Sequence, residues 1–338
     1  HEPVALFFRS LTERVGGLPG VAAVGATQQL PLDGRAGCSG IAAADREAET
    51  SGCFASTVHV TPGYFEAMGI EVEGEAPGWA EVMERRGHVV VSRPLAEHVW
   101  SGREPLGQGI KSVTSTPPFY EVTGVAAPVR HDGLSQPPVE RVYYPMIAMD
   151  GAPLWGPPRQ MTLVIRVAAG RPEALAAPVR EIIADLDPTA AIGEIRTMDE
   201  VVARSTAPTA FAMLLLAIAA AVALALGVIG LYGVVAYAVE QRRSEIGIRI
   251  ALGARAREVL LMVVGQAAWL TGIGVVAGLV AATMATRVLA SQLFEVRPGD
   301  PLTLAAAATL LLGVGLAAAF VPARRASRVE PMTVLRDE

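Results

Sequence analysis

The sequence predicts an integral membrane protein with three transmembrane helices, preceded by an extracytoplasmic α/β domain that contains a β-rich insertion. The main observation is that three long stretches lack Asp, Glu, Lys and Arg: Thr206–Val239, Val259–Thr286 and Pro301–Ala323. Each exceeds the ~20 apolar residues that cross a ~30 Å hydrocarbon core as a helix. Buried helices of a soluble protein are the alternative, and three such stretches in succession argue against it. We expect helices at about 207–238, 259–286 and 301–322.

The arginines predict which side of the membrane each part occupies. The loop between the first two stretches and the C-terminal segment are rich in arginine, whereas the loop at 287–300 has as many acidic as basic residues. Cytoplasmic loops carry the excess of basic residues. We therefore expect residues 1–205 and the 287–300 loop outside and Glu338 inside. The arginines that carry the prediction are Arg242, Arg243, Arg249, Arg255, Arg257, Arg324, Arg325, Arg328 and Arg336.

The outer domain, residues 1–205, alternates between helical and strand patterns, which is typical of mixed α/β domains. Val4–Val15 has the pattern of an amphipathic helix and Val21–Ala26 that of a strand. Thr61 followed by proline predicts the N-cap and first residue of a short helix that Gly69 ends. The sequence thus begins as an α/β unit.

From about residue 70 to 150 the pattern changes to short strands separated by Gly and Pro, which predicts the β-rich subdomain inserted into the α/β unit. These strands are expected at His88–Ser92, Phe119–Ala126 and Arg141–Pro145. The α/β pattern then returns, with a strand at Met161–Val167, a helix at Pro172–Leu186, a strand near Ile192–Ile195 and a helix that starts at Met198 and enters the membrane.

No motif in the chain predicts catalysis, a metal site or a bound cofactor. The string at Gly107–Ser112 lacks the spacing of a phosphate loop, so an ATP-driven role would need ATP to be bound by a separate subunit. His131 and Asp132 have the pattern of a solvated turn. An acidic outer domain without a basic stripe also argues against nucleic acid as a partner. Cys38 and Cys53 could form a disulfide or remain two unpaired, small apolar residues.

Within the three apolar stretches, only the phenols of Tyr232 and Tyr237 can ionise, which argues against an ion-coupled carrier. Small residues recur there at spacings that let helix backbones approach closely. Because Gly and Ala abound in this part of the chain, chance is the alternative to specific packing. The residues concerned are Gly227, Gly230, Gly233, Gly274, Gly278, Gly315 and Ala319.

The arginine-rich segment between the first two stretches predicts a short cytoplasmic helix at about 244–254. Ile246 and Ile250 lie one turn apart, and Glu245 and Arg249 are spaced for an ion pair. Nothing else in such a short loop is expected to bury the two isoleucines, which favours docking of the segment on a partner protein. The alternative is a solvated basic loop that only fixes the topology. Under the first interpretation the contact residues are Glu245, Ile246, Arg249, Ile250 and Gly253.

Strings along nearly the whole chain resemble the FtsX/MacB-type family of ABC transporter permeases, and the duplicated permeases common in acidobacteria in particular. The membrane part carries "GVIGLYGVVAYAVEQRRSEIGIRIALGA" and "PARRASRVEPMTVLRDE". The outer part carries "VTPGYFEAMGI", "PLGQGI", "YEVTGV" and "VYYPM". The resemblance implies that residues 1–205 are a MacB-like periplasmic core domain and residues 206–338 an FtsX-like permease domain.

The resemblance further implies a multi-pass protein of the bacterial inner membrane with four membrane helices per repeat, of which this chain holds the last three. The chain begins with His1 and no hydrophobic anchor precedes its outer domain, so we expect a fragment or the second part of a longer polypeptide. The implied partners are a cytoplasmic ABC ATPase, a second permease half or second copy, the lipid bilayer and a periplasmic adaptor. The helix at 244–254 would touch the ATPase.

Two functions follow from this sequence. In the first, the chain is the permease subunit of an export or mechanotransmission complex that couples ATP hydrolysis elsewhere to movement of the outer domain. In the second, it is a membrane regulator that relays the state of the ATPase to an outer hydrolase or a sensor kinase. An outer domain of this size favours the first function.

Overall fold

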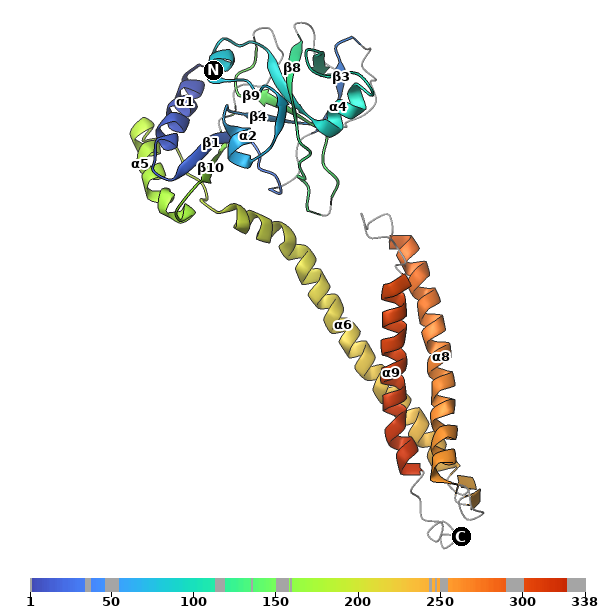
Figure 1. Cartoon of the computed structure of the whole chain (residues 1–338). Coiled ribbons are helices and arrows are strands. Elements are labelled where there is room, and N and C mark those ends of the chain that lie inside the picture. Colours follow the sequence, from blue (N-terminus) through green and yellow to red (C-terminus); the bar gives the residue numbers. More distant parts are fainter. Residues whose placement is uncertain are drawn as a thin grey trace. The chain divides into compact units, whose positions relative to one another are not determined.

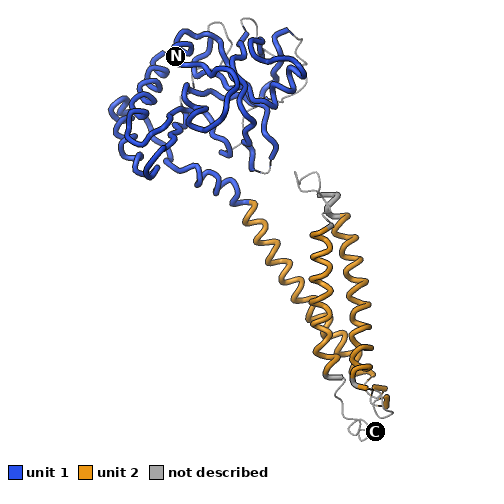
Figure 2. The backbone as a smooth tube through the Cα atoms, in the orientation of Figure 1, with its two compact units in different colours: residues 1–208 blue, residues 209–338 orange. Residues whose placement is uncertain are grey.

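The computed structural model describes residues 2–33, 38–45, 55–112, 119–134, 136–149, 158, 160–242, 245–246, 248–249, 255–289 and 301–326. The chain forms two compact units, residues 1–208 and residues 209–338 (Figure 2). Each unit is described by itself.

The first unit contains a mixed sheet with helices on both faces (Figure 1). Its helices are α1 (Glu2–Gly16), α2 (Tyr64–Met68), α3 (Trp79–Met83), α4 (Arg93–Val99), the 3-10 helix η1 (Pro172–Leu175) and α5 (Ala176–Leu186). Its strands are β1 (Val21–Thr27), β2 (Cys38–Ser39), β3 (Ile41–Ala43), β4 (Ala55–Val60), β5 (Val72–Gly74), β6 (His88–Ser92), β7 (Gly109–Ser112), β8 (Tyr120–Ala126), β9 (Arg141–Pro145) and β10 (Thr162–Val167).

The described strands join in one sheet with the order β10-β1-β4-β9-β6-β8-β7-β3, while β2 pairs with β4 and β5 with β8. Two neighbouring pairs, β4 with β9 and β6 with β8, are parallel, and the others are antiparallel. Strands β5 to β9 come from the stretch between residues 70 and 150, which also contributes α3 and α4. These strands continue the same sheet as β1, β4 and β10.

Alternating side chains of the strands build a core on each face of the sheet. At the β1–β10 end, α1 and α5 cover one face, where Phe8 and Val179 pack with Val24 of β1. Helix α2 covers the opposite face, where Tyr64 and Phe65 contact the ring of Tyr143 from β9. Strand β9 is buried along its whole length because both faces are covered. It therefore lies at the centre of the domain.

Helix α2 approaches β1 so closely that glycine is needed on both sides of the contact. A Cβ on Gly25 would lie 2.3 Å from the backbone nitrogen of Tyr64, and a Cβ on Gly63 would lie 2.2 Å from the carbonyl oxygen of Val24. Gly63 also has a φ of 84°, in the left-handed region that favours glycine. The two glycines thus fix where α2 sits on the sheet.

Two local predictions for this domain are wrong. Helix α2 begins at Tyr64 with Gly63 as its N-cap, while the Thr61 hydroxyl instead accepts a hydrogen bond from the backbone N–H of Ala26, at 2.7 Å. Residues 192–195 form no strand: they are irregular, and Ile192 and Ile195 are 41% and 45% exposed. Among the strands that the structure describes, none pairs with this segment.

The second unit consists of long apolar helices. Helix α6 (Met198–Gln241) starts in the first unit and continues into the second, followed by α8 (Ala256–Leu289) and α9 (Pro301–Ala326). Within the described residues, three helices are long and apolar enough to cross a membrane: Met198–Gln241, Arg257–Met284 and Leu302–Arg324. The predicted fold class, three transmembrane helices with a mixed α/β domain, is confirmed.

Candidate functional site

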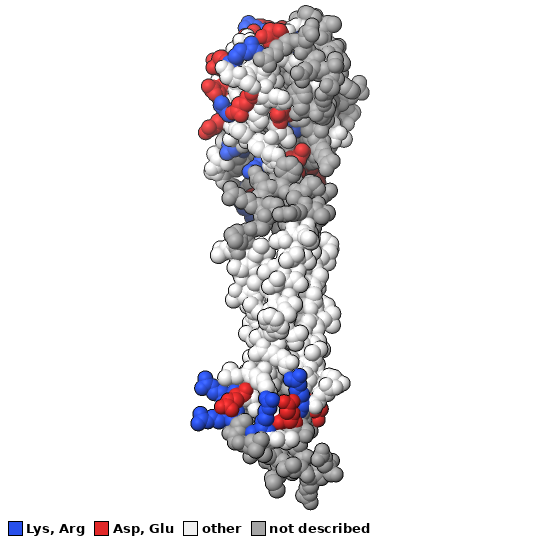
Figure 3. Space-filling model, turned by 90° about the vertical axis from the view of Figure 1, so that its right-hand side faces the viewer, with Lys and Arg blue, Asp and Glu red and all other residues white. Residues whose placement is uncertain are grey.

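The charged side chains that the structure describes in the helical unit gather at one end of the helices, next to a belt without charges (Figure 3). The end of α6, the start of α8 and the end of α9 meet here, because Val235, Val263 and Ala323 share one apolar cluster. The described charged residues of this end are Glu240, Arg242, Glu245, Arg249, Arg255, Arg257, Glu258 and Arg324. A surface of this kind suits contact with a polar partner outside the hydrocarbon core.

The segment between α6 and α8 keeps helical hydrogen bonding where it is described. The backbone N–H of Ile246 donates to the carbonyl of Arg242, at 2.9 Å. Arg249 forms an ion pair with Glu245, one turn earlier, at 2.7 Å, and both side chains are about half exposed. An exposed pair at this spacing stabilises a helix by only about 0.3–0.5 kcal/mol. The pair therefore leaves both charges available to a partner.

The expectation that Ile246 lacks a burial partner is wrong. Ile246 is 3% exposed, so the chain itself covers this side chain, whereas Ile248 is 53% exposed. The sequence pattern identified one apolar face of the helix, but tertiary packing decides whether that face turns inward. Ile250 and Gly253 lie outside the described residues. The exposed surface that the structure brings together, Glu245, Ile248 and Arg249, is called the coupling surface below.

The predicted small-residue positions divide into two groups. Gly315 and Ala319 lie at the contact of α9 with α8: a Cβ on Gly315 would come within 2.7 Å of Thr271, and Ala319 is fully buried. A Cβ on any of the other five would meet nothing within 4 Å in the described chain. These are Gly227, Gly230, Gly233, Gly274 and Gly278. Their role in helix packing stays a prediction.

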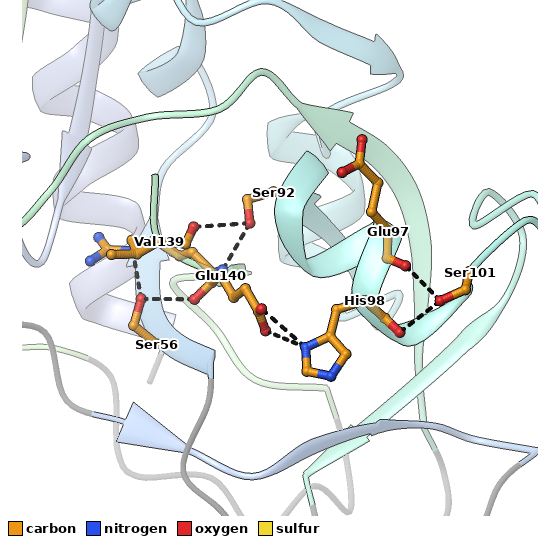
Figure 4. A network of polar contacts seen from close by, with 8 residues as sticks. Ser56, Ser92, Glu97, His98, Ser101, Val139 and Glu140 are labelled. Carbon is orange, nitrogen blue, oxygen red and sulfur yellow. Dashed lines mark hydrogen bonds and ion pairs between the residues drawn. The ribbon is translucent and has the colours of Figure 1, made fainter. Parts of the chain in front are cut away.

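A network of polar contacts surrounds the start of β9 in the outer domain (Figure 4). Arg141 donates from Nε to the Ser56 hydroxyl and from its backbone N–H to the Ser92 hydroxyl, both at 2.8 Å. The carboxylate of Glu140 lies 2.9 Å from Nδ1 of His98. The network thus connects β9 and the residue before it with β4, β6 and α4, and its role is to stabilise the sheet.

The interpretation of His131 as part of a solvated turn is wrong. Its side chain is 2% exposed, and burial, together with nearby Arg141, lowers its pKa to about 3. Neither ring nitrogen, and neither Nη atom of the fully buried Arg141, has a hydrogen-bond partner within the described chain. The sequence offered one signal for this cluster: an arginine that opens an otherwise apolar strand.

Two further predictions concern metal and disulfide chemistry. Cys53 and the side chain of Cys38 lie outside the described residues, so both alternatives, a disulfide and two unpaired cysteines, stay open. No group of three His, Cys, Asp or Glu side chains suited to a metal ion occurs among the residues that the structure describes.

Comparison with known proteins identifies both parts of the chain. Residues 6–186 match the model of the MacB-like periplasmic core domain, and residues 217–331 match that of the FtsX-like permease C-terminal. The pyoverdine export ATP-binding/permease protein PvdT of Pseudomonas fluorescens (strain Pf0-1) is 37% identical over 126 residues, which is 37% of this chain and 19% of that protein. The macrolide export ATP-binding/permease protein MacB of Rhodospirillum rubrum is 36% identical over 127 residues, again 37% of this chain and 19% of that protein.

The match therefore spans about a fifth of the length of these curated relatives. Among solved structures, the periplasmic region of MacB from Actinobacillus actinomycetemcomitans aligns with 53% of this chain and 73% of that chain, at 12% identity and a TM-score of 0.38. The two family matches together cover most of the chain, and the first alone covers more than half of it. The chain belongs to the FtsX/MacB-type family of ABC transporter permeases.

Proposed function

We propose that this chain is the permease part of an ABC-type export complex, in which an ATPase bound at the coupling surface drives movement of the outer domain. Residues 1–205 lie outside the cytoplasm of a bacterial inner membrane, and Glu338 lies inside. ATP is bound and hydrolysed by the ATPase and not by this chain. A second permease half or second copy completes the membrane part, and a periplasmic adaptor is a further partner.

The observation that carries this proposal is the continuity of α6. This helix starts at Met198 in the outer domain and ends at Gln241, directly before the coupling surface. A helix of 44 residues is about 66 Å long, roughly twice the ~30 Å of the hydrocarbon core. A single element of that length supports a mechanical connection between the two sides of the membrane.

The nature of the relatives supports export over a purely regulatory relay. The relatives compared above are named as exporters of pyoverdine or of macrolides, and those names combine ATP-binding and permease functions. The chain matches only a fifth of their length, so neither substrate is carried over to it. The proposal is limited to the class of activity.

Labelling of single cysteines in intact cells tests the orientation on which the proposal depends. In the full-length protein without its native cysteines, Leu134→Cys is expected to react with a membrane-impermeant maleimide from outside. Arg242→Cys is expected to react only after the cells are opened, because it lies at the charged end of the helical unit. Equal labelling of both positions in intact cells would contradict the proposed topology.

A further inference from the structure

We propose that the ion pair between Arg196 and Asp33 is the joint through which α6 moves the sheet of the outer domain. This inference rests on the proposed function and names the contact that transmits the motion. The polar cluster around Arg141 is the other unusual feature of this domain, but Arg141 and His131 are at most 2% exposed and offer a ligand no entry. The joint, in contrast, lies directly at the start of α6.

The segment before α6 is held firmly to the helix itself. Glu194 accepts two hydrogen bonds from the guanidinium of Arg204, at 3.0 and 2.5 Å, across the beginning of the helix. Thr197 and Glu200 form a reciprocal capping box: the Thr197 hydroxyl accepts from the Glu200 N–H, and the Glu200 carboxylate accepts from the Thr197 N–H. The segment from 194 to 204 therefore moves with the helix.

The side chain of Arg196 extends from this segment to the loop at 28–33, which follows strand β1. Its Nη2 lies 2.5 Å from Oδ2 of Asp33, and its side chain is only 20% exposed. Charge-assisted hydrogen bonds are stronger than neutral ones, and the partial burial of Arg196 reduces screening by solvent, although Asp33 is 40% exposed. Residues 192–195 form no strand and so do not join the sheet through backbone hydrogen bonds. Within the described chain, the ion pair of Arg196 with Asp33 connects the segment before α6 to the loop that follows β1.

The loop that receives the contact connects to the core of the sheet. Leu30 is buried beside Val58 and Tyr64, and the N–H of Leu32 donates to the carbonyl of His131, at 2.9 Å. Leu32 has a φ of 65°, which is unusual for a residue with a side chain and is kept only where the surroundings enforce it. A loop held in such a conformation can relax when its anchor at Asp33 is displaced.

Pro208 lies inside α6 at the boundary between the two units. Proline removes one backbone hydrogen bond and lets a helix bend. The helix nevertheless continues through Pro208 as one element from Met198 to Gln241. An axial shift of α6 would therefore reach the braced segment and, through Arg196, the loop at 28–33.

Hydrogen exchange of the full-length protein, co-purified with its ATPase, tests the joint. Exchange is compared with and without a non-hydrolysable ATP analogue in the wild type, in Arg196→Asp, in Asp33→Arg and in the double swap. In the wild type we expect a nucleotide-dependent change in the amides of 28–33. Each single variant should reduce that change at least threefold, and the double swap should restore it, while basal ATP hydrolysis stays unchanged.

The matched control is Arg14→Gln, which removes a more exposed ion pair of the same domain, to Asp185 at 2.7 Å, and should leave the response intact. Slow hydrogen exchange of the β9 amides shows that a variant is folded. If a charge-reversal variant does not fold, Arg196→Gln takes its place. If the single variants kept the full nucleotide-dependent change in exchange at 28–33, the role of the Arg196–Asp33 pair would be refuted, while the proposed function would stand. A wild type without any nucleotide response would overturn the proposed function itself.

Discussion

Replacing Gly63 with alanine is expected to lower the free energy of unfolding of the outer domain by about 2–6 kcal/mol. One contribution is the left-handed backbone at a φ of 84°, which costs a residue with a Cβ about 1–3 kcal/mol. The other is the clash of that Cβ with the Val24 carbonyl, 2.2 Å away, which is comparable to overpacking at about 1–3 kcal/mol. Thermal or urea unfolding of the full-length protein in detergent measures the loss.

Two matched variants separate these contributions. Gly102 also has a positive φ, 74°, but a Cβ there would meet nothing within 4 Å, so Gly102→Ala isolates the backbone cost. Gly25 lacks a positive φ, yet its Cβ would lie 2.3 Å from the Tyr64 nitrogen, so Gly25→Ala isolates the clash. If Gly63→Ala cost no more than Gly102→Ala, the close contact between α2 and β1 would be refuted.

Replacing Ile248 with aspartate is expected to weaken binding of the ATPase by about tenfold to a hundredfold. Burying an exposed isoleucine fully contributes about 1.5–3 kcal/mol, and Ile248 is 53% exposed before binding, so part of that amount is available. A buried aspartate without a partner adds a desolvation cost. Each 1.4 kcal/mol corresponds to a factor of ten. Pull-down of the ATPase and its rate of ATP hydrolysis provide the measurement.

The control is Ile192→Asp, the same change on an isoleucine that is 41% exposed in the outer domain, and it should leave ATPase binding unchanged. Ile246→Asp should instead destabilise the helical unit, because Ile246 is 3% exposed. Unaltered binding and hydrolysis in Ile248→Asp would mean that the segment only fixes topology, the alternative that the sequence left open.

The membrane helices and the inner strands could be predicted because each has a strong local sequence pattern. An apolar stretch without charges is costly anywhere but in lipid or a protein core, and strand β9 combines aromatic and β-branched residues with a proline at its end. These patterns are local, so they can be recognised without knowledge of the neighbouring elements. The family strings then indicated how the parts combine.

The predictions that were wrong all concern residues whose environment depends on contacts between parts of the chain far apart in the sequence. Thr61 before a proline looks the same whether its hydroxyl caps a helix or, as here, accepts from Ala26 of β1. His131 is buried near Arg141, and its carbonyl accepts a hydrogen bond from the N–H of Leu32, contacts that no local pattern reveals. Likewise, the helical period places Ile246 and Ile248 on different faces but does not tell which face turns inward. The sequence therefore predicts a coupling segment at 244–254 but not which of its side chains are exposed, and its role stays a prediction.

The most direct test of the proposed coupling is a comparison of the outer domain in two states of the ATPase. Hydrogen exchange is measured on the wild-type, full-length complex in lipid nanodiscs, with ATP analogue bound and without nucleotide. We predict that amides of the outer domain, which the proposal places on the far side of the membrane from the ATPase, change their exchange rates together with those of the segment at 242–249. Unchanged exchange throughout residues 2–208, in a complex that binds nucleotide and hydrolyses ATP, would contradict the proposal.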